Sequence, residues 1–169
     1  LPYKDHSFVQ NSMDTSDKDG KTELRRVPVL GLLQPDGIET YEYNGETYLV
    51  IANEGDSQDY KGYAEETRVK KIKDDIQLDA TYYQGYTQEA LDDMVKNGLF
   101  NDDQLGRLKV TTDQPFKDEH GRYHALVSYG GRSFSILRGS DLEMIYDSGN
   151  VIEQRILELL PERFNADYK

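Results

Sequence analysis

The sequence has no cysteine and no tryptophan, and basic residues are few relative to acidic ones. The lack of cysteine excludes a disulfide scaffold, a thiolate metal site and a cysteine nucleophile. The 169 residues contain 20 Lys and Arg against 32 Asp and Glu, so the formal net charge is −12 at pH 7. An acidic surface repels nucleic-acid phosphates and anionic membranes, and the densest basic run, residues 68–73, has acidic neighbours on both sides. We therefore expect no nucleic-acid partner.

Long apolar runs are also missing. The longest, such as residues 48–52, are far shorter than the roughly 20 residues that a helix needs to cross a bilayer. We therefore expect no direct membrane insertion in this segment. Hydrophobic residues make up 36% of the chain, and the length predicts one domain or a piece of one.

Residues 1–26 are polar and rich in turn formers, which predicts an irregular acidic lead-in. Regular structure is expected to begin at Val27. The apolar run 27–33 predicts a short strand, and residues 34–37, Gln-Pro-Asp-Gly, predict the turn that ends it. Residues 27–169 are then the structured part.

Two hairpins are predicted from paired glycine-containing turns. Asn44-Gly45 separates two alternating runs and favours a type I′ turn, which pairs Tyr43 with Glu46 and Tyr41 with Tyr48. Gly130-Gly131 separates residues 124–129 from 132–137 in the same way and predicts a second hairpin. Residues 142–146 follow as a further strand of a meander, and 105–112 predicts another strand.

Two short helices are expected between the strands. Leu91, Met94, Val95 and Leu99 follow helical spacing after Thr87. A second apolar stripe lies between Asn150 and Pro161, with Glu153 placed to complete a capping box; its members are Ile152, Ile156, Leu159 and Leu160. Both stripes are expected to pack against the rest of the protein. Short strands with tight turns and two inserted helices predict an all-β fold of antiparallel meanders.

Two acidic segments are candidate metal sites. Asp17 and Asp19 precede Gly20, but an EF-hand register would place Thr15 at the first ligand position and Arg26 at the twelfth, so this is not an EF-hand. A calcium site of another kind and a solvated acidic turn both remain open for this segment.

The second acidic segment follows directly after a predicted strand. Its hard oxygen donors are suited to Ca²⁺, and they come from Asn53, Glu54, Asp56 and Asp59. Loops held by a rigid strand are favoured places for binding sites. The alternative is a turn at Gly55 with solvated acids. The Gly55-Asp56-Ser57 run does not predict a serine hydrolase, because that mechanism needs a histidine base oriented by a carboxylate, and no Asp lies at the usual close spacing before a His in a C-terminal segment.

Several segments, in order along nearly the whole chain, resemble the choice-of-anchor I domain family. They are 4–7, 34–38, 48–56, 65–70, 105–108, 130–136 and 146–149. One departure is the stretch 112–120, where relatives tend to be richer in Asp and Gly. The resemblance implies an extracellular or cell-surface β-propeller of which this chain is a central portion. Isolated blades expose strand edges, so the rest of the propeller or another chain would complete the sheet.

What the resemblance implies about function leaves three hypotheses. The first is a non-enzymatic matrix or biomineralisation role with weak Ca²⁺ binding, because animal members are associated with calcium handling. The second is a metal-dependent phosphoesterase, because some bacterial relatives are labelled alkaline phosphatases; Arg68 and Arg132 would then clamp the phosphate. The third is an interaction scaffold without metal.

Overall fold

The structure is a computed structural model that describes residues 2–164. Short strands dominate, and they are joined mainly in antiparallel pairs with a few short helices between them. The fold is therefore of the all-β class, as predicted. The described strands form four open sheets and do not close into a ring.

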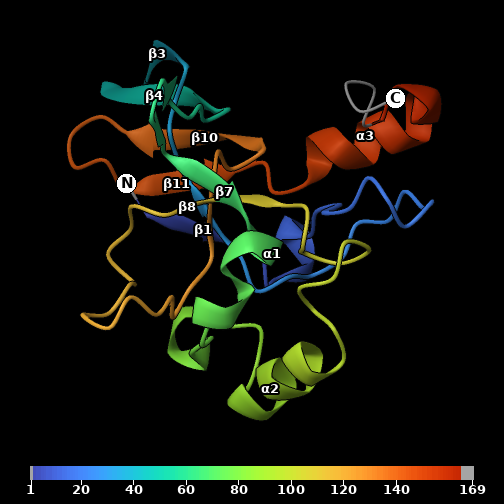
Figure 1. Ribbon diagram of the computed structural model, residues 1–169. Helices are drawn as coiled ribbons and strands as arrows, with labels where there is room; N and C mark the ends of the chain where they lie inside the picture. Colours follow the sequence, from blue (N-terminus) through green and yellow to red (C-terminus); the bar gives the residue numbers. More distant parts are fainter. Residues whose placement is uncertain (1, 165–169) are drawn as a thin grey trace.

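The largest sheet has four strands in the order β11-β10-β4-β3, and every neighbouring pair is antiparallel. Its strands are β3 (Gly37–Tyr43), β4 (Glu46–Asn53), β10 (Ser133–Arg138) and β11 (Met144–Asp147). The spatial order follows the chain order, and residues 54–132 form a long insertion between the second and third strands. Figure 1 shows this sheet at one end of the molecule and helix α2 at the other.

The β3–β4 hairpin has the predicted register. Tyr43 pairs with Glu46, and Tyr41 pairs with Tyr48. Asn44 and Gly45 have φ angles of 52° and 79°, which are the positive values that a type I′ turn requires. The rings of Tyr41 and Tyr48 stack with centroids 5.2 Å apart. The cross-strand contact predicted from the turn is thus confirmed.

The predicted hairpin around Gly130-Gly131 is wrong. Residues before the glycines form β9 (Val127–Tyr129), which pairs in parallel with β2 (Leu30–Leu32), whereas β10 pairs with β4 and β11. The glycine segment instead passes between two sheets. Gly130 has a φ of 79°, and a Cβ there would lie 1.9 Å from the Glu54 carbonyl oxygen, so only glycine fits this crossing.

Residues 1–26 were predicted to be irregular, but part of this segment is built into the fold. Residues Tyr3–Asp5 form strand β1, which pairs with β2, and a 3₁₀ turn follows at Val9–Asn11. Met13 is buried in the core and exchanges backbone hydrogen bonds with Arg25. The polar sequence of residues 3–5 did not indicate a strand, because the charged Lys4 side chain is buried through an ion pair with the distant Asp147.

The insertion supplies most of the hydrophobic core. Besides β9, its strands are β5 (Asp59–Tyr60), β6 (Tyr63–Ala64), β7 (Glu66–Arg68) and β8 (Lys109–Thr111). Its helices are α1 (Val69–Ile72) and α2 (Gln88–Lys96), with 3₁₀ turns at Lys73–Asp75 and Ala80–Tyr82. α2 begins at the predicted Thr87, whose hydroxyl accepts from the Ala90 N–H, and buries Leu91. Met13, Val27, Val29 and Leu30, which precede the insertion, complete the core.

The last helix, α3 (Val151–Leu159), is followed by a 3₁₀ turn at Pro161–Arg163. The prediction that its apolar stripe packs inward is wrong for the described residues, because Ile152, Leu159 and Leu160 are exposed. Glu153 is the buried residue of α3. Asn150 does not cap the helix through its side chain; it donates to the Ser12 hydroxyl at 2.7 Å instead. Polar contacts therefore hold this helix in place.

Candidate functional site

A cleft of about 310 Å³ brings together charged side chains from distant parts of the chain, and we call it the charged cleft. Strands β7 and β8, the segment 13–17 and the glycine crossing before β10 form its walls. Its basic residues are Arg68, Arg107, Lys109 and Arg132, and its acidic residues are Asp14, Asp17, Glu54 and Glu66. Both predicted phosphate-binding arginines therefore lie in one cleft with two of the predicted metal ligands.

Arg132 enters the charged cleft from a constrained backbone. Its φ angle is 53°, a left-handed value that is uncommon for residues other than glycine. The N–H groups of Gly131 and Arg132 both donate to the Asn53 carbonyl, at 2.8 and 3.1 Å. These bonds hold the arginine beside the end of β4.

Glu153 of α3 forms an ion pair with the Arg132 guanidinium. Only 8% of the Glu153 side chain is exposed, whereas 39% of the Arg132 side chain is. Burial raises the pKa of Glu153, while the positive charges of Arg132 and Lys4 act in the opposite direction. Glu153 was assigned to helix capping and this role was missed, because its partner Arg132 is distant in the sequence and no local pattern indicates the pair.

Two further ion pairs line the charged cleft. The Arg107 guanidinium donates to both carboxylate oxygens of Asp17, and the distance from Nη2 to Oδ2 is 2.8 Å. These hydrogen bonds lower the pKa of the Asp17 carboxyl. Lys109 pairs with Glu66 across the β7–β8 ladder. Arg68 donates to the Arg107 carbonyl at 3.2 Å. Asp17 is therefore held by an arginine, and Asp19, the other candidate ligand of that segment, binds Arg25.

The four residues predicted as the main metal ligands lie in different surroundings. Asn53 is buried, and its amide nitrogen donates to the hydroxyls of Ser133 and Ser135 at 3.0 and 2.7 Å. Glu54 and Asp56 line a shallow acidic hollow of about 360 Å³ with Asp36. Asp59 begins strand β5. Among residues 2–164, no three carboxylate or imidazole side chains lie close enough together to hold a metal ion.

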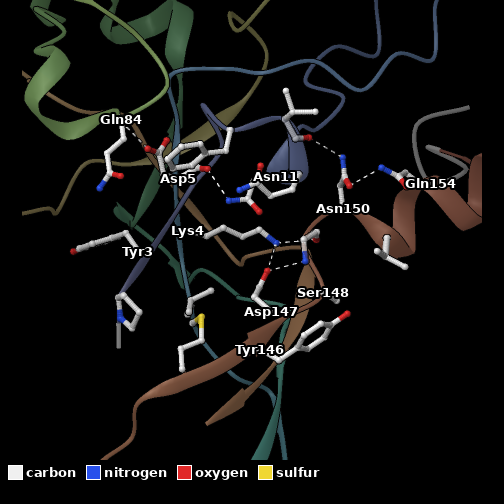
Figure 2. A pocket seen from close by; sticks show the side chains of 18 residues that line it. Tyr3, Lys4, Asp5, Asn11, Gln84, Tyr146, Asp147, Ser148, Asn150 and Gln154 are labelled. Carbon is white, nitrogen blue, oxygen red and sulfur yellow. Dashed lines mark hydrogen bonds and ion pairs between the residues drawn. The ribbon is translucent and has the colours of Figure 1, made fainter.

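A second cleft, of about 880 Å³, lies between strands β1 and β11, and we call it the strand-edge cleft (Figure 2). At its floor the Lys4 ammonium forms an ion pair with Asp147 at 3.0 Å and donates to the Gly149 carbonyl at 2.8 Å. Only 4% of the Lys4 side chain is exposed. Burial lowers the Lys4 pKa, although Asp147 opposes that shift.

Asp147 also binds the serines of the neighbouring strand. The hydroxyls of Ser133 and Ser135 donate to its Oδ2 atom at 2.9 and 2.7 Å. These contacts and Lys4 lower the pKa of Asp147 despite the opposing effect of burial. Asp147 thus joins β1, β10 and β11, a role that sequence analysis did not assign.

His6 is buried beside these residues. Its Nδ1 atom lies 2.6 Å from the Asn11 carbonyl, so the ring N–H donates there. Burial lowers the pKa of His6 to about 4, which keeps the ring neutral at physiological pH.

The family model of the choice-of-anchor I domain matches residues 1–169. The chain belongs to this family. It is also similar to Gigasin-3a of Magallana gigas, with 44% identity over 62 residues, which are 37% of this chain and 22% of that protein. The match therefore spans about a fifth of the relative's length. No solved structure matches the chain.

Membership of the choice-of-anchor I domain family and the similarity to Gigasin-3a indicate an extracellular or cell-surface protein. In the part of the chain that the structure describes, no helix is both long enough and apolar enough to cross a bilayer.

Proposed function

We propose that this chain is part of an extracellular or cell-surface binding protein with a non-enzymatic, matrix-type role, and that the charged cleft is its ligand site. The observation that supports the proposal is the meeting of Glu54 with Arg68 and Arg132 in one cleft. The three residues come from the end of β4, from β7 and from the crossing before β10. A carboxylate and two guanidinium groups are thereby offered to one ligand.

The pairing of charges in the cleft indicates the kind of ligand. Arg107, Lys109 and Arg132 each have a carboxylate partner. Among the described residues, the Arg68 guanidinium donates to one acceptor, a backbone carbonyl, and the Glu54 carboxylate has no hydrogen-bond or ion-pair partner. A ligand that carries both signs of charge satisfies both groups. We therefore propose a divalent cation such as Ca²⁺ together with an oxyanion.

The donor set does not by itself fit a calcium site, because Ca²⁺ takes six to eight oxygen ligands and the described residues lack a three-carboxylate group. Oxygens of the bound anion would supply additional ligands, and Arg68 would neutralise the anion through paired N–H groups. A protein that holds Ca²⁺ with its anion would suit a matrix or biomineralisation-type role.

Isothermal titration calorimetry tests this proposal with CaCl₂ and methylphosphonate, an oxyanion that cannot be hydrolysed as an ester. We expect each to bind weakly alone and about ten-fold more tightly when the other is present. Glu54→Gln should weaken the Ca²⁺ response and Arg68→Ala the methylphosphonate response. Glu158→Gln and Arg155→Ala, which alter an exposed pair on α3, are the matched controls. No heat with both ligands at millimolar concentration would contradict the proposal.

The acidic hollow is an alternative place for the cation, because Glu54 lines both it and the charged cleft. Asp36 and Asp56 line only the hollow. Asp56→Asn should leave the joint binding unchanged if the cation lies in the charged cleft. A loss equal to that of Glu54→Gln would place the cation in the hollow.

A metal-dependent phosphoesterase is the second candidate, and the shared cleft of Arg68 and Arg132 favours it. The two guanidinium groups would clamp a phosphate while a bound metal ion supplied the Lewis acid. Hydrolysis of p-nitrophenyl phosphate that stops on addition of chelator would support this candidate. Inertness with Mg²⁺, Ca²⁺, Mn²⁺ and Zn²⁺ would exclude it and leave a binding role.

We also propose that the four-stranded sheet is a blade of a β-propeller completed by the rest of a longer protein or by another chain. Four antiparallel strands in chain order are typical of a blade. One face of this sheet exposes aromatic side chains, among them Tyr41, Phe134 and Tyr146. Hydroxyl-radical footprinting should show Phe134 and Tyr146 protected in the longer protein relative to this chain. Equal labelling in both would contradict the blade assignment.

A further inference from the structure

The strand-edge cleft lies between two strands that each have one free edge. Within residues 2–164, β1 pairs with β2 alone and β11 pairs with β10 alone. Residues of both strands line the cleft, as Figure 2 shows for Tyr3, Lys4, Tyr146 and Asp147. A free edge carries backbone N–H and C=O groups that lack strand partners. The walls of this cleft therefore offer main-chain hydrogen bonds.

The register of β11 indicates which of its groups are available. The Ser148 N–H donates to the Phe134 carbonyl at 2.9 Å, and Tyr146 lies opposite Ile136. Backbone groups alternate in direction along an antiparallel strand. The N–H and C=O of Asp147, which lies between these two positions, are thus directed away from β10 and toward the open edge.

The charges in the cleft are already compensated. Lys4 and Asp147 form an ion pair, and the Asp5 carboxylate accepts the N–H groups of Ser7 and Gln84, each at 2.9 Å. A charged ligand would gain little from these satisfied groups. The remaining walls include apolar side chains and neutral carboxamides, among them Phe8, Val9, Leu33, Met144, Gln10 and Gln154.

We propose that the strand-edge cleft binds an extended, uncharged peptide segment of another polypeptide, which adds a strand to the free edge of β11. Main-chain hydrogen bonds to the Asp147 backbone fix the segment, and its alternate side chains enter the apolar part of the cleft. Met144, Tyr146 and Asp147 of β11 line the cleft, and Ser148 and Gly149 continue its wall. The four residues of β11 span about 13 Å, so a segment of about four or five residues fits this edge. The inference is independent of the charged cleft, since no residue lines both clefts.

A five-residue peptide with the sequence of residues 133–137 of β10, which has no charged side chain, is the first probe. Its backbone and side chains already pair with β11 on the opposite edge of that strand. With blocked ends, the peptide should bind the full chain with submillimolar affinity in an NMR titration. The Asp147 amide should then exchange with solvent more slowly. A peptide that is N-methylated at alternate residues cannot form the ladder and should not bind.

Two matched variants locate the binding. Val9 lines the cleft and is 69% exposed, whereas Leu159 on α3 lies outside it and is 68% exposed. Val9→Asp places an uncompensated charge in the cleft and should weaken peptide binding by about ten-fold or more. Leu159→Asp should change nothing, because it alters an equally exposed apolar residue elsewhere.

Several results would overturn the inference. Equal binding of the N-methylated peptide would show that the contact is not a strand addition, and equal loss in Leu159→Asp would show that it is not in the cleft. Failure of the β10 peptide and of a displayed heptapeptide library would exclude a peptide ligand. Binding of a neutral oligosaccharide to the cleft, or dimerisation of the chain lost in Val9→Asp, would assign the cleft to a different occupant.

Discussion

The charged cleft and the strand-edge cleft both contain ion pairs, but water reaches these pairs to different degrees. In the strand-edge cleft, 4% of the Lys4 side chain and 19% of the Asp147 side chain are exposed. In the charged cleft, Lys109 is 55% exposed and Arg132 is 39% exposed. The ion pair of the strand-edge cleft is therefore part of the protein framework. The ion pairs of the charged cleft leave guanidinium and ammonium groups accessible to a ligand.

The satisfied hydrogen bonds explain this difference. The Asp147 carboxylate accepts hydrogen bonds from two serine hydroxyls and the Gly149 N–H and pairs with Lys4, so its partners all come from within the protein. Glu54 and Arg68 in the charged cleft retain binding capacity within the described residues. A buried, fully bonded charge fixes structure, whereas a half-exposed, partly bonded charge is suited to binding.

The largest effect is expected from Asp147→Asn, which leaves the Lys4 ammonium buried without its counter-charge. We expect a loss of about 3 kcal/mol in the free energy of unfolding, measured by urea denaturation. Asp141→Asn removes a carboxylate from an exposed pair with Arg138 and is the control, for which no measurable change is expected. Similar values for the two variants would contradict the structural role of the Lys4 pair.

A smaller effect is expected from Glu153→Gln, which removes the carboxylate partner of Arg132 in the charged cleft. The Arg132 guanidinium loses its carboxylate but remains in contact with water, and the burial cost of the Glu153 charge is removed as well, so the change in stability should be about 1 kcal/mol or less. Thermal unfolding followed by circular dichroism measures it. A loss as large as that of Asp147→Asn would mean that the two clefts do not differ in the way described above.

The two carboxyl groups should also respond to pH with opposite signs. Because the folded-state pKa of Glu153 is raised, its contribution favours folding at low pH and is lost as pH rises through that folded pKa. Because the folded-state pKa of Asp147 is lowered, its contribution is present above the unfolded pKa and is lost as pH falls through the folded one. Melting temperatures of Glu153→Gln and Asp147→Asn relative to the original chain, between pH 2.5 and 8, should therefore differ with opposite slopes.

The smallest effect is expected from Lys109→Met, which removes the outermost pair of the charged cleft. More than half of the Lys109 side chain is exposed, so we expect a change of about 0.5 kcal/mol or less. Its stability in urea at low and high salt provides the measurement. A larger loss that persists at high salt would show that water is excluded from this cleft as well.

The features that sequence analysis predicted correctly are those decided by neighbours along the chain. Asn44-Gly45 determines the β3–β4 register through its own backbone angles, and Thr87 determines where α2 begins. The pairing of β10 could not be predicted from Gly130-Gly131, because β4, which is distant in sequence, competes for the same edge. A tight turn is compatible with a hairpin but does not require one.

The candidate site was predicted in part, for a related reason. Arg68 and Arg132 were named together through the family resemblance, and the structure brings both to one cleft. Asn53 was assigned to a metal, but its amide is turned toward Ser133 and Ser135, since these serines lie on the strand that pairs with β4. Glu153 and Asp147 were missed because buried charges are recognised by partners that lie far away in the sequence.

The long insertion between β4 and β10 has a consequence for how the molecule forms. Asn53 and its register partner Ser133 are separated by 80 positions. The β3–β4 hairpin closes locally, but β10 can join it only after residues 54–132 have brought the chain back, and such distant contacts form late and slowly. During synthesis the edge of β4 would therefore stay unpaired until β10 has been made. A chaperone or rapid collapse of the insertion would need to prevent this edge from associating with another chain.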